Sequence, residues 1–103
     1  MEVREVHYTT LLQAGVRRRH FHQRIGKWII KFSIQIEISR KGEWVPVVRY
    51  DTAHGFAHRD TFSQDGRVEK IPLRIDHWGD ALTYAENDLK VNWRTYISNF
   101  ERG

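Results

Sequence analysis

The segment Trp28–Ser39 constrains the fold more than any other part of the chain. From Ile30 on, its apolar and polar side chains alternate. The apolar set is Ile30, Phe32, Ile34, Ile36 and Ile38, and the polar set is Lys31, Ser33, Gln35, Glu37 and Ser39. A period of two sends alternate side chains to opposite sides of a strand, so this pattern predicts a half-buried β-strand with one side against a core.

Three shorter strands are predicted after it, separated by turn-forming residues. The strands are Trp44–Asp51, Phe56–Phe62 and Arg67–Leu73, and the turns are Arg40–Glu43, Thr52–Gly55 and Gln64–Gly66. Gly42 suits the first turn because glycine accepts a positive φ. Pro46 cannot donate to a ladder, which indicates a sheet edge or a bulge at that position. Short turns between successive strands predict an antiparallel meander of about four strands.

The residues before Trp28 have a weaker pattern. Residues 3–12 alternate loosely and fit either a strand or a short helix. Residues 13–26 contain two glycines and three consecutive arginines, and they predict a loop.

From about Trp78 the apolar period changes to three and four residues, which is typical of an amphipathic helix. The repeating residues are Ala81, Ala85, Leu89, Trp93, Tyr96 and Phe100, with Leu82 and Ile97 at the margins. Asp76 or Asp80 is expected to cap the start. About 22 helical residues would be about 33 Å long, enough to cross the meander. We therefore predict an α+β class, with the sheet packed against one long C-terminal helix in a single domain spanning residues 1–103.

The composition limits which cellular compartment and which kinds of chemistry are expected for the chain. The chain has no cysteine, which excludes disulfides, thiolate zinc sites and a cysteine nucleophile and is typical of a reducing compartment. No apolar run approaches the about 20 residues of a membrane span. Charged residues follow Met1 where a signal peptide would have its apolar core. We expect a cytoplasmic protein that makes no membrane contact.

Positive charge is concentrated in residues 16–41. This window holds eight basic side chains against one acid, although the net charge of the whole chain is only +4. A basic surface is typical of a protein that binds nucleic acid or an acidic protein. The candidate nucleic-acid-binding residues are Arg17, Arg18, Arg19, His20, His22, Arg24 and Lys27. A solvated loop would explain the same charges equally well.

The segment Arg49–Asp60 concentrates side chains that can carry or transfer charge. The candidate catalytic residues are Arg49, Tyr50, Asp51, His54, His58, Arg59 and Asp60. His58 and Asp60 share one face of the predicted strand, whereas Arg59 points to the other. If the two flanking strands pair, Arg49 or Asp51 lies near His58 or Asp60. An aspartate in that position would orient the imidazole.

Three interpretations of this segment remain open. In the first, its polar side chains cover an exposed sheet face, and Asp51 and His54 hydrogen-bond the turn. In the second, His58 is a general acid or base, and Arg49 or Arg59 stabilises the charge on the phosphorus. RNA supplies its own nucleophile, the 2′-hydroxyl, so this chemistry requires no metal. In the third, His54, His58 and a carboxylate bind a metal ion, although such sites need three or four converging ligands.

Residues 49–60 read R-Y-D-x-x-H-G-x-x-H-R-D, which is similar to a string between two strands in a group of small uncharacterised prokaryotic proteins. The likeness runs from about Trp28 to the C-terminal helix. More loosely, the segment resembles the TumE-type toxins of toxin–antitoxin loci. The matching residues are Tyr50, Asp51, Gly55 and His58. Phe56 and Asp60 stand where that family has a lysine and a second histidine. The resemblance implies a small RNA-directed toxin that a helix-turn-helix antitoxin neutralises.

We therefore expect a metal-independent endoribonuclease of the toxin class that needs no cofactor. His58 would exchange protons, Arg49 and Arg59 would contact the phosphate, and Asp51 or Asp60 would orient the histidine. The expected partners are RNA and a helix-turn-helix antitoxin or another acidic protein. The alternative is a non-catalytic nucleic-acid-binding or protein-interaction module of such a system. The oligomeric state stays open, a homodimer included.

Overall fold

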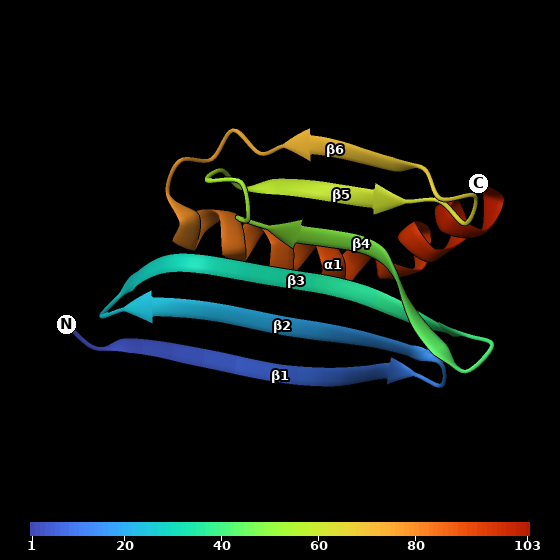
Figure 1. The fold of residues 1–103 in the computed structure, drawn as a ribbon, viewed down its shortest axis with the longest axis horizontal. Coiled ribbons are helices and arrows are strands. Elements are labelled where there is room, and N and C mark those ends of the chain that lie inside the picture. Colours follow the sequence, from blue (N-terminus) through green and yellow to red (C-terminus); the bar gives the residue numbers. More distant parts are fainter.

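In the computed structural model, which describes residues 1–103, six antiparallel strands form one sheet and a single helix packs against one side of it (Figure 1). The elements are β1 (Val3–Gln13), β2 (Val16–Ile25), β3 (Trp28–Arg40), β4 (Glu43–Asp51), β5 (His58–Phe62), β6 (Val68–Pro72) and α1 (Trp78–Arg102). Each strand pairs with its neighbour in the sequence, so the sheet is a meander. The α+β prediction is confirmed, and the strand number is corrected from about four to six.

β3 carries the core, as its alternation predicts. Phe32, Ile34, Ile36 and Ile38 are all buried and pack in one cluster with the helix. The buried helix residues are Ala81, Leu82, Ala85, Leu89, Trp93 and Phe100. We call this side of the sheet the helix-covered face and the opposite side, which carries the polar residues of β3, the open face. α1 contacts only β3, β4 and β5, so β1 and β2 extend beyond the helix (Figure 1).

Residues 13–26 are not the predicted loop. Most of them form β2, which is hydrogen-bonded to β1 on one side and to β3 on the other. Residues 3–12 belong to β1, so the strand alternative was right there. Of the residues of β2, only Val16 joins the core cluster with the helix, so the rest of that strand does not need an apolar face. The strand therefore lacks the alternation that identified β3.

Two turn signals have clear structural outcomes. Lys41 and Gly42 have φ angles of 52° and 81°, as a two-residue hairpin with two left-handed positions requires. Pro46 pairs with Glu37 of β3, but it lies before Val48, where the pairing of β4 with β5 begins, so its missing N–H costs no ladder hydrogen bond to β5. Beside it the register of β3 against β4 shifts, and Val47 is the extra residue of a bulge.

α1 begins where the change of period predicts, but its cap is different. The N-cap is His77, whose Nδ1 accepts a hydrogen bond from the backbone N–H of Asp80 at 3.3 Å. Neither Asp76 nor Asp80 provides the cap. The helix has 25 residues, slightly more than expected. It lacks the combination of length and apolar character that crossing a membrane would require.

Candidate functional site

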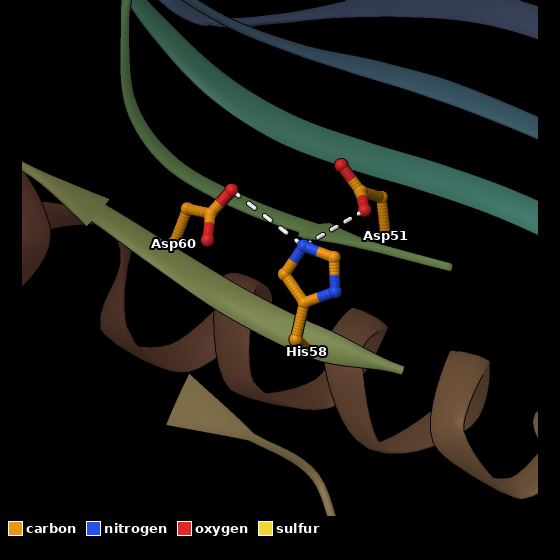
Figure 2. Close-up of side chains that lie close together, drawn as sticks. All are labelled: Asp51, His58 and Asp60. Carbon is orange, nitrogen blue, oxygen red and sulfur yellow. Dashed lines mark ion pairs between the residues drawn. The ribbon is translucent and has the colours of Figure 1, made fainter. Parts of the chain in front are cut away.

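The pairing of β4 with β5 brings three titratable side chains together on the open face. Asp51 lies opposite His58, and Arg49 lies opposite Asp60. His58 Nε2 is 3.0 Å from Asp51 Oδ1 and 3.6 Å from Asp60 Oδ2 (Figure 2). We call Asp51, His58 and Asp60 the acid–histidine cluster. Its members share a face because a strand has a period of two, as the sequence predicts.

The cluster is buried although no helix covers it. The side chains of His58, Asp60 and Asp51 are 1%, 8% and 13% exposed. The rings of His54 and Phe56 lie with their centroids 5.4 Å and 5.3 Å from that of His58, and His54 itself is exposed. The loop between β4 and β5 therefore supplies the cover.

Hydrogen bonds of the loop fix the orientation of the cluster. His58 Nδ1 lies 3.3 Å from the carbonyl oxygen of Phe56. Asp51 Oδ1, the same oxygen that faces His58, accepts a hydrogen bond from the backbone N–H of Ala53 at 3.0 Å. Asp51 thus holds the turn, as the first interpretation expects, and contacts the imidazole as well.

The contact between His58 and Asp51 can be made in two ways. An Nε2–H of the imidazole can donate to Asp51 Oδ1 across 3.0 Å. If Nδ1 instead donates to the Phe56 carbonyl at 3.3 Å, the lone pair of Nε2 faces the carboxylate, and a proton or a cation fits between them. Lys70 Nζ lies 2.8 Å from Asp60 Oδ1 and neutralises only one of the two carboxylates.

A groove of about 630 Å³ lies over the open face beside the cluster. Among the side chains that line it are His7, Arg19, Phe21, Lys31, Arg49 and Asp51. Three of these are cations, and Asp51 is the member of the cluster that reaches the groove. Arg49 Nε donates to Gln35 Oε1 at 2.7 Å, which holds the guanidinium at the groove wall. The groove can therefore bring an anion next to Asp51 and His58.

Sequence reasoning missed His7, Phe21 and Lys31 as groove residues. Lys31 could have been found, because it belongs to the polar half of the alternation in β3. The other two come from β1 and β2, whose strand character was not recognised. Lys70 was missed because nothing in the sequence shows that β6 pairs it with Asp60, as the register does.

Tyr50 and Arg59 point to the helix-covered face, away from the histidine with which they were predicted to act. Tyr50 and Tyr96 both donate to Asp88 Oδ2, at 2.7 Å and 2.6 Å. Arg59 Nη1 donates to the hydroxyl of Tyr96 at 3.1 Å. We call Tyr50, Arg59, Asp88 and Tyr96 the tyrosine–aspartate cluster. It links the sheet to α1, and the sheet separates it from His58.

The electrostatics of the tyrosine–aspartate cluster fit a structural role. Burial raises the pKa of Tyr50, and the bond to Asp88 adds to the effect. Burial also raises the pKa of Tyr96, to about 12. Burial alone would raise the pKa of Asp88, but hydrogen bonds from Tyr96, Tyr50 and Asn92 outweigh it and lower that pKa. The tyrosines therefore stay protonated and the aspartate stays charged near neutral pH.

The seven basic-window candidates do not form one surface, because those in β2 alternate between its faces. Arg17 and Arg19 lie on the open face and contact Glu37 at 2.5 Å and 3.5 Å. Arg17 also stacks over Trp44 at 4.1 Å. The remaining candidates are Arg18, His20, His22 and Arg24, on the other face of β2, and Lys27, in the turn after it. Of the seven, only Arg19 and His20 line the groove.

His20 and His22 form a contact of their own. His20 Nε2 lies 2.7 Å from His22 Nδ1, and the ring of His20 stacks on Tyr8 with centroids 4.5 Å apart. Burial, with the nearby charges of His22 and Arg18, lowers the pKa of His20 to about 4. His20 is therefore neutral near pH 7 and contributes no positive charge to the basic window.

The chain belongs to the family described as "Domain of unknown function (DUF7718)", which matches residues 1–103. No curated protein and no solved structure matches the chain.

Proposed function

We propose that this DUF7718 protein is an RNA-directed endoribonuclease whose chemistry needs no metal ion. One observation carries the proposal: a groove lined by cations ends at the Asp51–His58 pair. Arg19, Lys31 and Arg49 supply the charge that attracts phosphates, and the pair supplies a proton-exchanging group beside them. Because RNA is its own nucleophile, the groove and the pair suffice for cleavage.

Single-stranded RNA fits the groove better than a duplex. Phe21 stands on the open face with the ring of His7 at 4.7 Å and Lys31 Nζ at 5.8 Å. Aromatic rings among cations bind unpaired bases by stacking while the cations follow the backbone. The bases of a duplex are already stacked on one another and cannot use such a ring.

In the proposed reaction Asp51 is the groove-side member of the proton-exchanging pair. It accepts the proton of a 2′-hydroxyl as the 2′-oxygen bonds to phosphorus, and His58 holds the carboxylate in position. The bond from phosphorus to the 5′-oxygen breaks, and the protonated imidazole of His54, whose ring centroid lies 5.4 Å from that of His58, gives its proton to the leaving oxygen. Arg49 stabilises the charge on the phosphoryl oxygens. The products are a 2′,3′-cyclic phosphate and a 5′-hydroxyl.

The test is cleavage of single-stranded RNA by the purified protein in EDTA. We expect products with cyclic-phosphate ends. His58→Gln should lower activity by up to about 10²–10⁴-fold, the usual effect of losing a positioned acid–base group, because it leaves the base Asp51 without the imidazole that positions it. His77→Asn, which changes an exposed histidine at the start of α1, is the matched control and should cleave normally. Cleavage that survives His58→Gln unchanged would come from a contaminant and would refute the proposal.

The second candidate is a non-catalytic nucleic-acid-binding module. It is favoured by the burial of His58, whose side chain is only 1% exposed and whose two ring nitrogens both face groups of the protein. This candidate predicts RNA binding that weakens with salt and no cleavage products under any condition. The same incubation, analysed by gel for products and by filter binding for complexes, separates the two candidates.

The partner and the location follow from the proposed activity. A ribonuclease that acts on cellular RNA would work in the cytoplasm and would have to be restrained there. A helix-turn-helix antitoxin with an acidic surface could cover the cations of the groove. Co-expression of such a protein should relieve growth arrest caused by the wild type, and catalytically dead His58→Gln should need no relief.

A further inference from the structure

We infer that the acid–histidine cluster binds one first-row divalent cation of the Mn²⁺ or Zn²⁺ kind. The inference goes beyond the proposed function, in which Asp51 and His58 act without an ion. It starts from three buried side chains whose ligand atoms lie within 4.8 Å of one another. Lys70 neutralises only one of the two carboxylates, so a metal ion beside His58 would balance the charge of the other.

The donor atoms have the spacing of metal ligands. Metal–ligand bonds of about 2.1 Å, with ligand–metal–ligand angles of about 90–110°, place neighbouring ligand atoms about 3.0–3.4 Å apart. His58 Nε2 lies 3.0 Å from Asp51 Oδ1 and 3.6 Å from Asp60 Oδ2, and the three donor atoms lie within 4.8 Å of one another. In Figure 2 both carboxylates approach the same nitrogen of the imidazole from two sides. Small movements would therefore suffice to enclose an ion.

Groups around the cluster hold the ligands in the required state. The Phe56 carbonyl, 3.3 Å from Nδ1, selects the tautomer whose Nε2 lone pair faces the carboxylates, an arrangement found for most metal-binding histidines. The backbone N–H of Ala53 orients Asp51. Oδ2 of Asp60 faces His58, whereas Oδ1 contacts Lys70, whose positive charge opposes the ion. An imidazole with two carboxylates suits Mn²⁺ and Zn²⁺ better than the all-oxygen sites of Ca²⁺.

A bound ion would change the proposed chemistry. Ligation uses the lone pairs of His58 Nε2 and Asp51 Oδ1, so the pair could no longer exchange a proton as it does without the ion. We therefore expect Mn²⁺ to slow the EDTA-resistant cleavage as the site fills. In this way the ion would act as an inhibitor of the metal-free reaction.

The direct test titrates the purified full chain with Mn²⁺ and follows the free ion by electron paramagnetic resonance, with no RNA present. We expect one saturable site per chain. His58→Gln and Asp60→Asn should each weaken binding at least tenfold. Asp80→Asn is the matched control, because it removes a surface contact with His77 of the same 3.6 Å length, and it should leave binding unchanged.

Lys70→Gln is a further variant whose expected effect is tighter binding, a result that unfolding cannot produce. Its side chain is 41% exposed, and its loss removes a positive charge that competes with the ion, so binding should tighten several-fold. Absence of saturable binding by the wild type at millimolar Mn²⁺, equal binding by His58→Gln, or no gain from Lys70→Gln would each overturn the inference. Ion binding without cleavage would refute only the proposed function, and cleavage without ion binding would refute only this inference.

Discussion

The acid–histidine cluster and the tyrosine–aspartate cluster are built from neighbouring residues of the same two strands. Tyr50 precedes Asp51 in β4, and His58 precedes Arg59 in β5. Alternation sends one residue of each pair to the helix-covered face and the other to the open face. On the helix-covered face, Asp88 accepts hydrogen bonds from two tyrosines. On the open face, an imidazole nitrogen and a carboxylate oxygen face each other at 3.0 Å beside a groove.

The difference separates polar groups that stabilise a fold from polar groups that are available to a ligand. In the tyrosine–aspartate cluster one carboxylate accepts from two tyrosines under a helix, and only Arg59 Nε is buried without a partner. In the acid–histidine cluster two carboxylates face one imidazole nitrogen, and Asp51 reaches a groove lined by cations. Mutations in the first should change the free energy of unfolding, and mutations in the second should change activity or binding.

The largest expected effect comes from Asp51→Asn on the open face. The amide oxygen can still accept from Ala53, so the turn and the melting temperature should be preserved. The proton acceptor is lost, so the rate of RNA cleavage should fall about 10²–10⁴-fold. Initial rates on a labelled single-stranded RNA measure this. Tyr50→Phe is the control on the opposite face, and its rate per folded molecule should equal that of the wild type.

The next effect is on stability and belongs to the helix-covered face. Asp88→Leu should lower the free energy of unfolding by about 2–4 kcal/mol, because it leaves the buried hydroxyl of Tyr50 without an acceptor. Urea unfolding followed by tryptophan fluorescence measures the change. A loss smaller than that caused by Asp51→Asn would reverse the assignment of the two clusters to stability and to activity.

Acid should destabilise the protein through His20, outside both clusters. The pKa of His20 is lowered from 6.5 in the unfolded chain to about 4 in the folded protein. Stability is therefore complete above pH 6.5 and falls as the pH drops toward 4, because the unfolded chain takes up the proton first. The loss should approach about 3 kcal/mol. Urea unfolding at several pH values should show a flatter profile for His20→Phe.

The smallest expected effect compares two consecutive arginines of β2. Arg19 lines the groove and Arg18 does not. Arg19→Gln should therefore weaken RNA binding and reduce the slope of log affinity against log salt by about 0.7, the value for one lost contact with a single strand. Arg18→Gln should leave the slope near that of the wild type. Equal slopes for both variants would remove Arg19 from the RNA-binding surface.

The sequence predicted well those elements that have one apolar and one polar side. β3 was recognised because α1 covers one of its faces, so alternation was required there. α1 was recognised for the same reason. β2 was taken for a loop because both of its faces carry polar side chains beyond the reach of the helix. A period-two pattern identifies a strand only where one side of the sheet is buried.

The candidate site was predictable in part. The two-residue period placed His58 and Asp60 on one face, and the short loop after β4 brought Asp51 beside them. The same period places Arg59 and its strand partner Tyr50 on the opposite face from His58, although both were named as candidate catalytic residues. The cations of the groove were harder to predict, because their proximity depends on how three strands align. Register between distant strands follows from the packing of the whole sheet and not from a local motif.

The position of α1 after all six strands has a consequence during translation. β1 to β6 leave the ribosome before the 25 residues of the helix, and each strand can pair with the one before it as it emerges. The nascent sheet then exposes Phe32, Ile34 and Ile36, which α1 buries only later. Until α1 has emerged and packed on the sheet, this apolar surface can associate with another nascent chain or bind a chaperone. Ribosomes that stall before Phe100 would therefore leave an aggregation-prone sheet, and a slow codon near the start of the helix would lengthen that interval.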